Sequence, residues 1–133
     1  MIIERPNFQR LAGDIAGQII LPEDADYEVA RRVWNGMIDK RPLGIVRCAN
    51  ADDVLATIAF ASDNGIEDIA VRGGGHNIAG NATCDRGLLI DLSPMKSIEV
   101  DPHNRRARAG GAGFSGASSM PRRRNWGLLR TAG

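Results

Sequence analysis

The chain has 133 residues with a formal net charge of +1, two cysteines and 43% hydrophobic residues. This composition allows one domain with a core, and it excludes an intrinsically disordered protein and a disulfide framework. No apolar run approaches the roughly 20 residues of a membrane-spanning helix. The first residues lack the pattern of a signal peptide, so we expect a cytoplasmic protein without a membrane partner.

The charges are distributed unevenly along the chain. Seven of the 17 basic residues are arginines after residue 104, and no Asp or Glu follows Asp101, so the part before them is net acidic. A basic end on an acidic body is compatible with a small nucleic-acid-binding protein. However, the arginine cluster at 122–124 has no interleaved aromatic residues and matches no recognised motif. We therefore expect no nucleic-acid partner.

Residues 1–40 are predicted to form a helical lead-in. Asn7 is a suitable N-cap for a short helix that ends near Ile15. Residues 19–22 are expected to be extended, because a proline at position 22 disfavours helix at the preceding residue. A second helix is predicted over 26–35, whose apolar residues and those just beyond it recur at spacings of three and four: Tyr27, Ala30, Val33, Trp34, Met37 and Ile38. On this pattern Trp34 packs in the core and is not a stacking platform.

The next stretch predicts a strand–helix–strand unit. Residues 43–48 form the first strand, Asn50 caps the helix, and Gly65 ends it in a left-handed conformation. The second strand, 68–71, follows at once, so the two strands are expected to pair in parallel. The helix is expected to bury its apolar stripe, which consists of Val54, Leu55, Ile58, Ala59 and Ala61.

Further strands are predicted after this unit. Residues 88–92, Leu-Leu-Ile-Asp-Leu, are expected to form a second buried strand. Residues 97–100 and 106–109 are expected to form a hairpin around the turn at 102–104. The fold class that follows is α+β, without a complete Rossmann sheet and without a linker between two domains.

The most informative stretch is residues 69–80. Ile69–Val71 is a short apolar run that fits a strand covered on both faces. Gly73, Gly74 and Gly75 then remove every Cβ atom where the chain leaves the sheet, so that a ligand can approach the backbone N–H groups. Consecutive N–H donors form a site for an anion, usually a phosphate. Arg72 adds a positive charge before the loop, and His76 adds an imidazole after it.

Two common phosphate loops are excluded by the spacing of these residues. The dinucleotide pattern G-x-G-x-x-G, started at Gly73, would need a glycine where Ile78 stands. A P-loop started at Gly75 would need Lys and Ser or Thr after Gly80, where Asn81 and Ala82 stand. An ordinary tight turn at the three glycines remains an alternative.

The loop nevertheless resembles a known one. Arg72–Asn77 is similar to the pyrophosphate loop of flavin-dependent oxidases of the vanillyl-alcohol-oxidase superfamily, within its berberine-bridge-enzyme-like branch. Residues 45–54, 88–96 and 100–102 resemble the family's elements around that loop, so the likeness covers about residues 20–113. It implies that 41–113 is the N-terminal part of an FAD-binding domain of the PCMH type, with FAD as cofactor.

The resemblance also implies roles for single residues. The loop amides would hold the FAD pyrophosphate, and His76 would contact the flavin, with a covalent bond to the 8α-methyl group as the stronger form of that role. Arg72 is either a phosphate contact or a support for the loop backbone, and Asn77 either bonds the cofactor or shapes the turn. The cofactor-binding residues expected from the resemblance are Arg72, Gly73, Gly74, Gly75, His76, Asn77 and Gly80.

No catalytic residue or metal site is expected. Asp91 and Asp101 are predicted to be strand-end and turn residues. Cys48 and Cys84 match no zinc-ligand spacing together with the two histidines, so both cysteines are expected to be small buried apolar residues.

The resemblance stops at residue 113, where the family continues with a second flavin segment and a substrate domain that carries the catalytic base. Residues 114–133 have no helical periodicity, and we interpret them as an unmatched basic tail. A frameshift near Ser115 is one hypothesis, since the same nucleotides read one base out of step can encode the start of an amphipathic helix.

We therefore expect an apparently truncated FAD-binding fragment of an enzyme that oxidises a small organic substrate with oxygen, inactive by itself. A cofactor-binding or partner-complementing module without activity of its own is the alternative.

Overall fold

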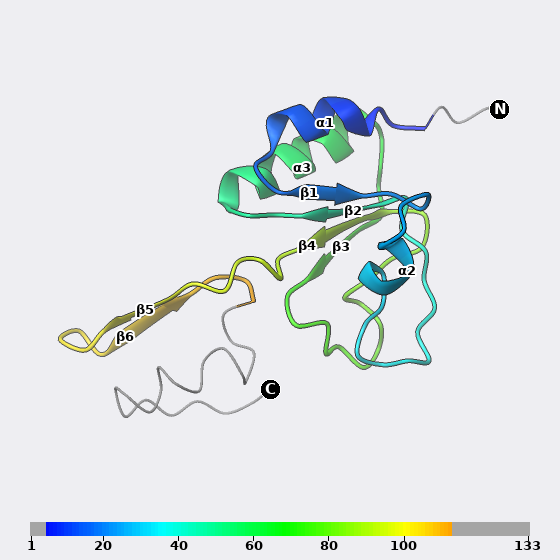
Figure 1. Cartoon of the computed structure of the whole chain (residues 1–133). Coiled ribbons are helices and arrows are strands. Elements are labelled where there is room, and N and C mark those ends of the chain that lie inside the picture. The colour runs from blue at the N-terminus through cyan, green and yellow to red at the C-terminus, as the bar shows by residue number, and fades with distance from the viewer. Residues whose placement is uncertain (1–4, 113–133) are drawn as a thin grey trace.

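The computed structural model describes residues 5–112, so the basic tail predicted for 114–133 lies outside the described residues. Its centre is a four-stranded sheet with the order β1-β2-β4-β3 (Figure 1). β1 (Gln18–Ile20) pairs antiparallel with β2 (Gly44–Arg47), whereas β4 (Leu88–Asp91) pairs in parallel with both β2 and β3 (Ile69–Arg72). The predicted α+β class is confirmed.

Helices lie on both faces of this sheet. α1 (Phe8–Asp14) and α3 (Ala51–Asp63) cover one face, and the short α2 (Tyr27–Ala30) lies on the other (Figure 1). The predicted caps are confirmed, because the side chains of Asn7 and Asn50 accept hydrogen bonds from the amides of Gln9 (3.2 Å) and Asp53 (2.9 Å). Gly65 ends α3 with φ at +64°, as expected.

The core consists of two layers, one on each side of the sheet. On the side of α1 and α3, Val46 and Ile90 pack under Phe60, whose ring lies 5.3 Å from that of Phe8. On the side of α2, Ile45 and Leu89 pack with Ile20, Tyr27, Ala30, Ala70 and Cys84. Both layers depend on β4, because all four of its residues are buried.

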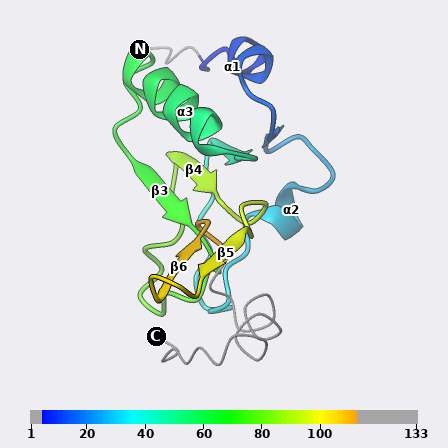
Figure 2. The same cartoon turned by 90° about the vertical axis from the view of Figure 1, so that its left-hand side faces the viewer.

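A hairpin follows the sheet. β5 (Ile98–Asp101) and β6 (Arg106–Ala109) pair antiparallel, as predicted, and extend away from the four-stranded sheet (Figures 1 and 2). The carboxylate of Asp101 accepts hydrogen bonds from the amide (3.1 Å) and the side chain (2.7 Å) of Asn104, which fixes the turn. Within residues 5–112, no helix is long and apolar enough to cross a membrane.

The predicted direct pairing of the first two parallel strands is wrong. β4 lies between β2 and β3, because all four of its residues are buried and its apolar residues Leu88, Leu89 and Ile90 fill both core layers. β3 is consequently an edge strand, and it is not covered on both faces as expected. Ile69 and Val71 are 38% and 53% exposed, whereas Ala70 and Arg72 are buried.

The predicted helix over 26–35 is also wrong beyond Ala30, and so is the placement of Trp34 in the core. α2 has four residues, Trp34 is 68% exposed, and Met37 is 91% exposed. The backbone N–H of Trp34 donates to the carbonyl oxygen of Gly75 (3.0 Å) and not to a helical acceptor. A long-range hydrogen bond has therefore replaced the helical one that the apolar spacing indicated.

The buried face of α3 differs from the predicted stripe. Leu55 and Ile58 are 65% and 47% exposed, whereas Asp53 and Thr57 are buried with Phe60 and Ala61. Ala59 is exposed as well, so of the predicted stripe only Ala61 is fully buried, with Val54 partly so. The two polar residues can be buried because their hydrogen bonds are satisfied within the protein.

Candidate functional site

The site begins with three charged residues that end the three parallel strands. Arg47, Asp91 and Arg72 lie side by side in the register of β2, β4 and β3. One carboxylate oxygen of Asp91 accepts hydrogen bonds from Arg72 (2.8 Å) and Arg47 (3.4 Å), and the other accepts from the amide of Ser93 (3.0 Å). This row lies at the carboxyl edge of the parallel strands, where such sheets place their ligands.

Asp91 is ionised despite its burial. Only 1% of the residue is exposed, and burial alone would raise the pKa of its carboxyl group. The hydrogen bond and the charge of Arg72, together with Ser93, outweigh this effect and hold the pKa of Asp91 below its ordinary value. Asp91 is a strand-end residue, as predicted, but the sequence did not indicate that it anchors Arg72.

Arg72 supports the glycine loop from below. It is 7% exposed, and it uses one guanidinium nitrogen for Asp91 and another for the carbonyl oxygen of Arg32 (3.0 Å). Its aliphatic stem packs under Gly75, since a Cβ atom added there would lie 3.3 Å from Cδ of Arg72. The charge is therefore largely neutralised by Asp91, and this geometry favours the supporting role over a phosphate contact.

The loop from Gly73 to Gly75 requires glycine for steric reasons. A Cβ atom at Gly73 would lie 2.5 Å from the carbonyl oxygen of Gly111, which is closer than two such atoms can approach. Gly75 has a φ angle of +71°, which residues with a side chain rarely adopt. The alternative of an ordinary solvent-facing turn fits poorly, because this loop is packed against two other segments of the chain.

The loop presents unused hydrogen-bond donors. In the described part of the chain, the amides of Gly73, Gly74 and Gly75 donate to no protein acceptor, and Gly74 is exposed. Backbone donors that follow one another at the end of a parallel strand form an anion site. The pyrophosphate of a dinucleotide cofactor fits such a site, because close approach to the backbone requires the absence of Cβ atoms.

His76 and Asn77 follow the glycines. His76 is exposed, and its ring lies 6.5 Å from that of Trp34, at a tilt of 51°. The side-chain oxygen of Asn77 accepts a hydrogen bond from the amide of Asn81 (3.1 Å), and the backbone oxygen of Asn77 accepts one from the amide of Gly80 (3.3 Å). Asn77 and Gly80, the latter with φ at +79°, therefore shape the turn that returns the chain from the loop.

A further wall of the site was missed by the sequence analysis. The 31–40 segment lies against the loop, where Asn35 and Lys40 donate to the carbonyl oxygens of Ile78 (3.0 Å) and Gly80 (3.1 Å). The dipeptide Asn35-Gly36 is a turn signal, but it lies at the predicted end of the helix and does not indicate that the helix ends at Ala30. No local signal shows that the segment would contact residues 40 positions later.

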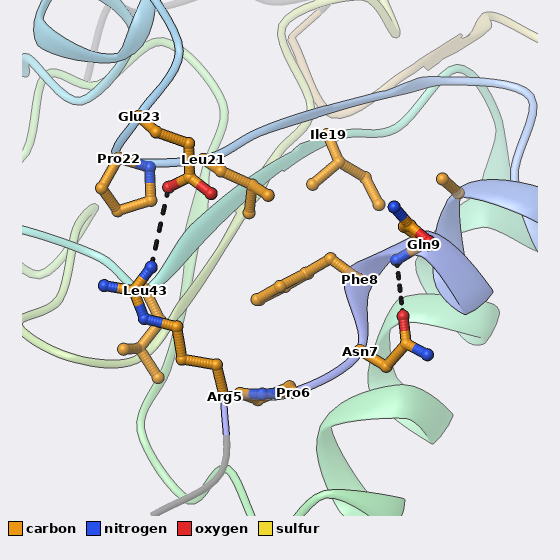
Figure 3. Close-up of a pocket in the computed structure, with 11 residues that line it drawn as sticks. Arg5, Pro6, Asn7, Phe8, Gln9, Ile19, Leu21, Pro22, Glu23 and Leu43 are labelled. Atoms are coloured by element: carbon orange, nitrogen blue, oxygen red, sulfur yellow. Dashed lines mark hydrogen bonds and ion pairs between the residues drawn. The ribbon is translucent and has the colours of Figure 1, made fainter.

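A separate apolar hollow of about 460 Å³ lies at the opposite edge of the sheet. Figure 3 shows the ring of Phe8 among Ile19, Leu21 and Pro22, with the ion pair of Arg5 and Glu23 (3.9 Å) at its rim. No residue of the glycine loop lines this hollow.

The cysteines are buried, as predicted. Cys48 and Cys84 are both free, and burial, with the charge of Asp68, raises the pKa of Cys84 to about 11. Among the residues that the structure describes, no group of three His, Cys, Asp or Glu side chains could hold a metal ion.

Several known proteins are similar to this chain. A family described as "FAD binding domain" matches residues 42–117. (R)-6-hydroxynicotine oxidase of Paenarthrobacter nicotinovorans is 44% identical over 102 residues, which are 77% of this chain and 22% of the relative. The chain thus spans about a fifth of the length of the curated relatives it matches.

Solved structures show the same relationship. The crystal structure of 6-hydroxy-D-nicotine oxidase from Arthrobacter nicotinovorans has a TM-score of 0.75 at 41% identity, over 80% of this chain and 23% of that one. A variant of BBE-like 1 from Physcomitrella patens has a TM-score of 0.65 at 24% identity, over 74% of this chain and 21% of that one, which shows a shared fold.

Proposed function

Because this chain belongs to the FAD binding domain family of FAD-linked oxidoreductases, we propose that its glycine loop binds the FAD pyrophosphate. The observation that carries the proposal is the set of unused amides at Gly73, Gly74 and Gly75, located at the carboxyl edge of the parallel strands. Backbone donors bind the pyrophosphate without a side chain in the way, and they compensate its charge only in part.

The other residues of the loop have supporting roles in this proposal. Arg72 holds the loop from below through Asp91, while Asn77 and Gly80 fix the return of the chain. His76 is assigned to the flavin, since it is exposed immediately after the donors. The roles of Arg72, Asn77 and Gly80 follow from their contacts and backbone conformation, whereas that of His76 follows from its exposed position.

We also propose a covalent link at His76. The link would join an imidazole nitrogen of His76 to the flavin 8α-methyl carbon. Its formation would release one proton from the imidazole N–H, one from the methyl group and two electrons, which oxygen would accept to give hydrogen peroxide. His76 is suited to this role because its side chain is exposed to an incoming ligand. Acid precipitation tests the link, because a covalently bound flavin stays with the protein and a free one is released.

The activity that we propose for the family-length protein is oxidation of a small organic substrate with oxygen as acceptor. When bound, FAD would supply the redox chemistry: the substrate would lose two electrons and two protons, and oxygen would gain them to become hydrogen peroxide. We assign no catalytic base to this chain, so the 133-residue protein alone is not expected to turn over. We place the protein in the cytoplasm, a setting that suits its two free cysteines.

A titration with FAD tests the binding site. We expect Gly73→Ala to weaken FAD binding by about tenfold or more, because the new Cβ atom meets backbone and cannot be accommodated by a side-chain movement. Gly13→Ala is the matched control, since a Cβ atom there meets nothing within 4 Å and Gly13 lies in α1, outside the proposed site. If the wild-type protein binds no FAD at high micromolar concentrations, or if both variants bind equally, the loop is not the binding site.

A module that complements a partner chain is the second candidate. Ile58, Ile69 and Val71 are exposed apolar side chains, and exposed apolar surface is typical of a contact with another polypeptide. Co-expression with a separate C-terminal fragment of a related oxidase would test it. Recovery of a yellow, active complex is expected if the module complements, and failure of the two pieces to copurify would reject it.

A further inference from the structure

Trp34 has an unusual combination of exposure and fixed position. The indole is 68% exposed, although tryptophan is mostly buried in folded proteins. At the same time its backbone N–H is bonded to the carbonyl oxygen of Gly75 (3.0 Å), the last of the three loop glycines. An exposed aromatic ring on an anchored backbone is a preformed contact surface.

The neighbours of Trp34 tie it to the loop on both sides. The carbonyl oxygen of Arg32 accepts a hydrogen bond from Arg72 (3.0 Å), and the side chain of Asn35 donates to the carbonyl oxygen of Ile78 (3.0 Å). Asn35 also accepts a hydrogen bond from the amide of Met37 (3.1 Å), which holds the turn. The chain around Trp34 is thus held by three hydrogen bonds to residues 72–78, about 40 positions later in the chain.

The indole lies beside the residue that we assign to the flavin. Its ring centroid is 6.5 Å from that of His76, and the two planes are tilted by 51°, so the rings are adjacent but not stacked on each other. Both side chains are exposed, so a third ring can approach them. The oxidised flavin ring is planar and electron-poor, and the electron-rich indole is the natural stacking partner for such a ring.

We propose that Trp34 is a binding residue for the flavin-ring end of FAD, and that the 31–40 segment forms a second wall of the cofactor site. This inference rests on the proposed function of the glycine loop. In this arrangement two parts of the chain bind different parts of the cofactor. The loop amides bind the pyrophosphate, and the indole contacts the flavin ring beside His76.

The division can be tested with two ligands and the full 133-residue protein. ADP has the pyrophosphate and the adenosine of FAD but no flavin ring. We expect Trp34→Ala to weaken FAD binding by about tenfold, which is within the range of one lost aromatic stacking contact. ADP binding should change by less than about twofold, because the loop amides remain. Trp34→Phe should retain most of the FAD affinity, since it keeps an aromatic ring.

Controls separate a contact from a change in folding. Leu55→Ala, at a 65% exposed position of α3 outside the proposed cofactor site, should leave both affinities unchanged. Melting temperatures of all variants should agree within a few degrees, because Trp34 is exposed. If Trp34→Ala melts lower, Trp34→Leu replaces it, since Leu keeps an apolar side chain but has no ring. Isothermal titration measures the affinities without relying on tryptophan fluorescence.

The outcomes distinguish this inference from the function on which it rests. A parallel loss of FAD and ADP binding in Trp34→Ala would mean that Trp34 only supports the loop, and this would overturn the inference but keep the loop assignment. Unchanged FAD binding in that variant would also overturn it. Wild-type protein that binds neither ligand would reject the loop assignment itself, and the inference with it.

Discussion

Replacing Asp91 by Asn should strongly destabilise the protein. The substitution keeps the shape of the side chain but removes the charge opposite Arg72, which is 7% exposed and donates to it at 2.8 Å. Breaking a buried ion pair by removing one partner costs about 3–5 kcal/mol, because the other charge stays buried without compensation. Arg47 adds little to this value, since its side chain is 34% exposed and its distance is 3.4 Å.

The expected loss is large compared with the total stability. For a chain of this size, 3 kcal/mol corresponds to a decrease in melting temperature of about 12 °C. Urea denaturation gives the free energy directly, and Asp101→Asn is the control, because that carboxylate is exposed and bonds only within its turn. The double variant Asp91→Asn with Arg72→Met should recover part of the loss, since it leaves no charge unpaired. If Asp91→Asn costs no more than the control, the buried pair does not hold the strand ends together.

Three further predictions concern stability and association. The pKa of Asp91 and the pKa of Asp53 are both held below the ordinary value for a carboxyl group. The two ionised carboxylates therefore stabilise the fold above the unfolded pKa of about 4, and this stabilisation is lost as pH falls below that value. Urea midpoints measured between pH 7 and 3 should fall more steeply for the wild type than for Asp91→Asn. Asp53→Asn should cost about 2–4 kcal/mol in urea denaturation, because Asp53 accepts three amides at 2.8–2.9 Å and the amide side chain has one acceptor oxygen; a cost below 1 kcal/mol would contradict this. The protein should self-associate through the exposed side chains of Ile58 and Val71. The double variant Ile58→Glu with Val71→Lys should have a smaller sedimentation coefficient than the wild type. A wild-type protein that is already monomeric would contradict the prediction that this surface mediates association.

Local signals predicted most of the elements. The caps at Asn7 and Asn50, the left-handed Gly65 and the turn after Asp101 each depend on residues that are close in sequence, and all four were found where expected. Propensity and capping act over one turn of chain, so they can be deduced from a single sequence. The glycine loop belongs to the same class, because its three glycines are consecutive.

The errors all come from contacts between distant residues. The helix after Ala30 ends because the amide of Trp34 bonds to Gly75, and the buried face of α3 is set by Asp53, which accepts the amides of Ala16 and Gly17 from 36–37 positions earlier. Apolar spacing cannot reveal a polar residue that is buried because distant backbone groups satisfy it. The pairing of Arg72 with Asp91 was missed for the same reason, since it depends on the strand register.

The strand order and the candidate site are two consequences of one arrangement. Asp91 can contact both Arg47 and Arg72 only because β4 lies between β2 and β3. The central position of β4, which the sequence did not reveal, therefore also gives Arg72 the partner that holds it under the glycine loop. Gly73–Gly75 has no side chains with which to fix its own shape. Its conformation therefore comes from Arg72 below and from the 31–40 segment beside it. A donor array held in this way is preorganised, so little ordering is required when an anion binds to it.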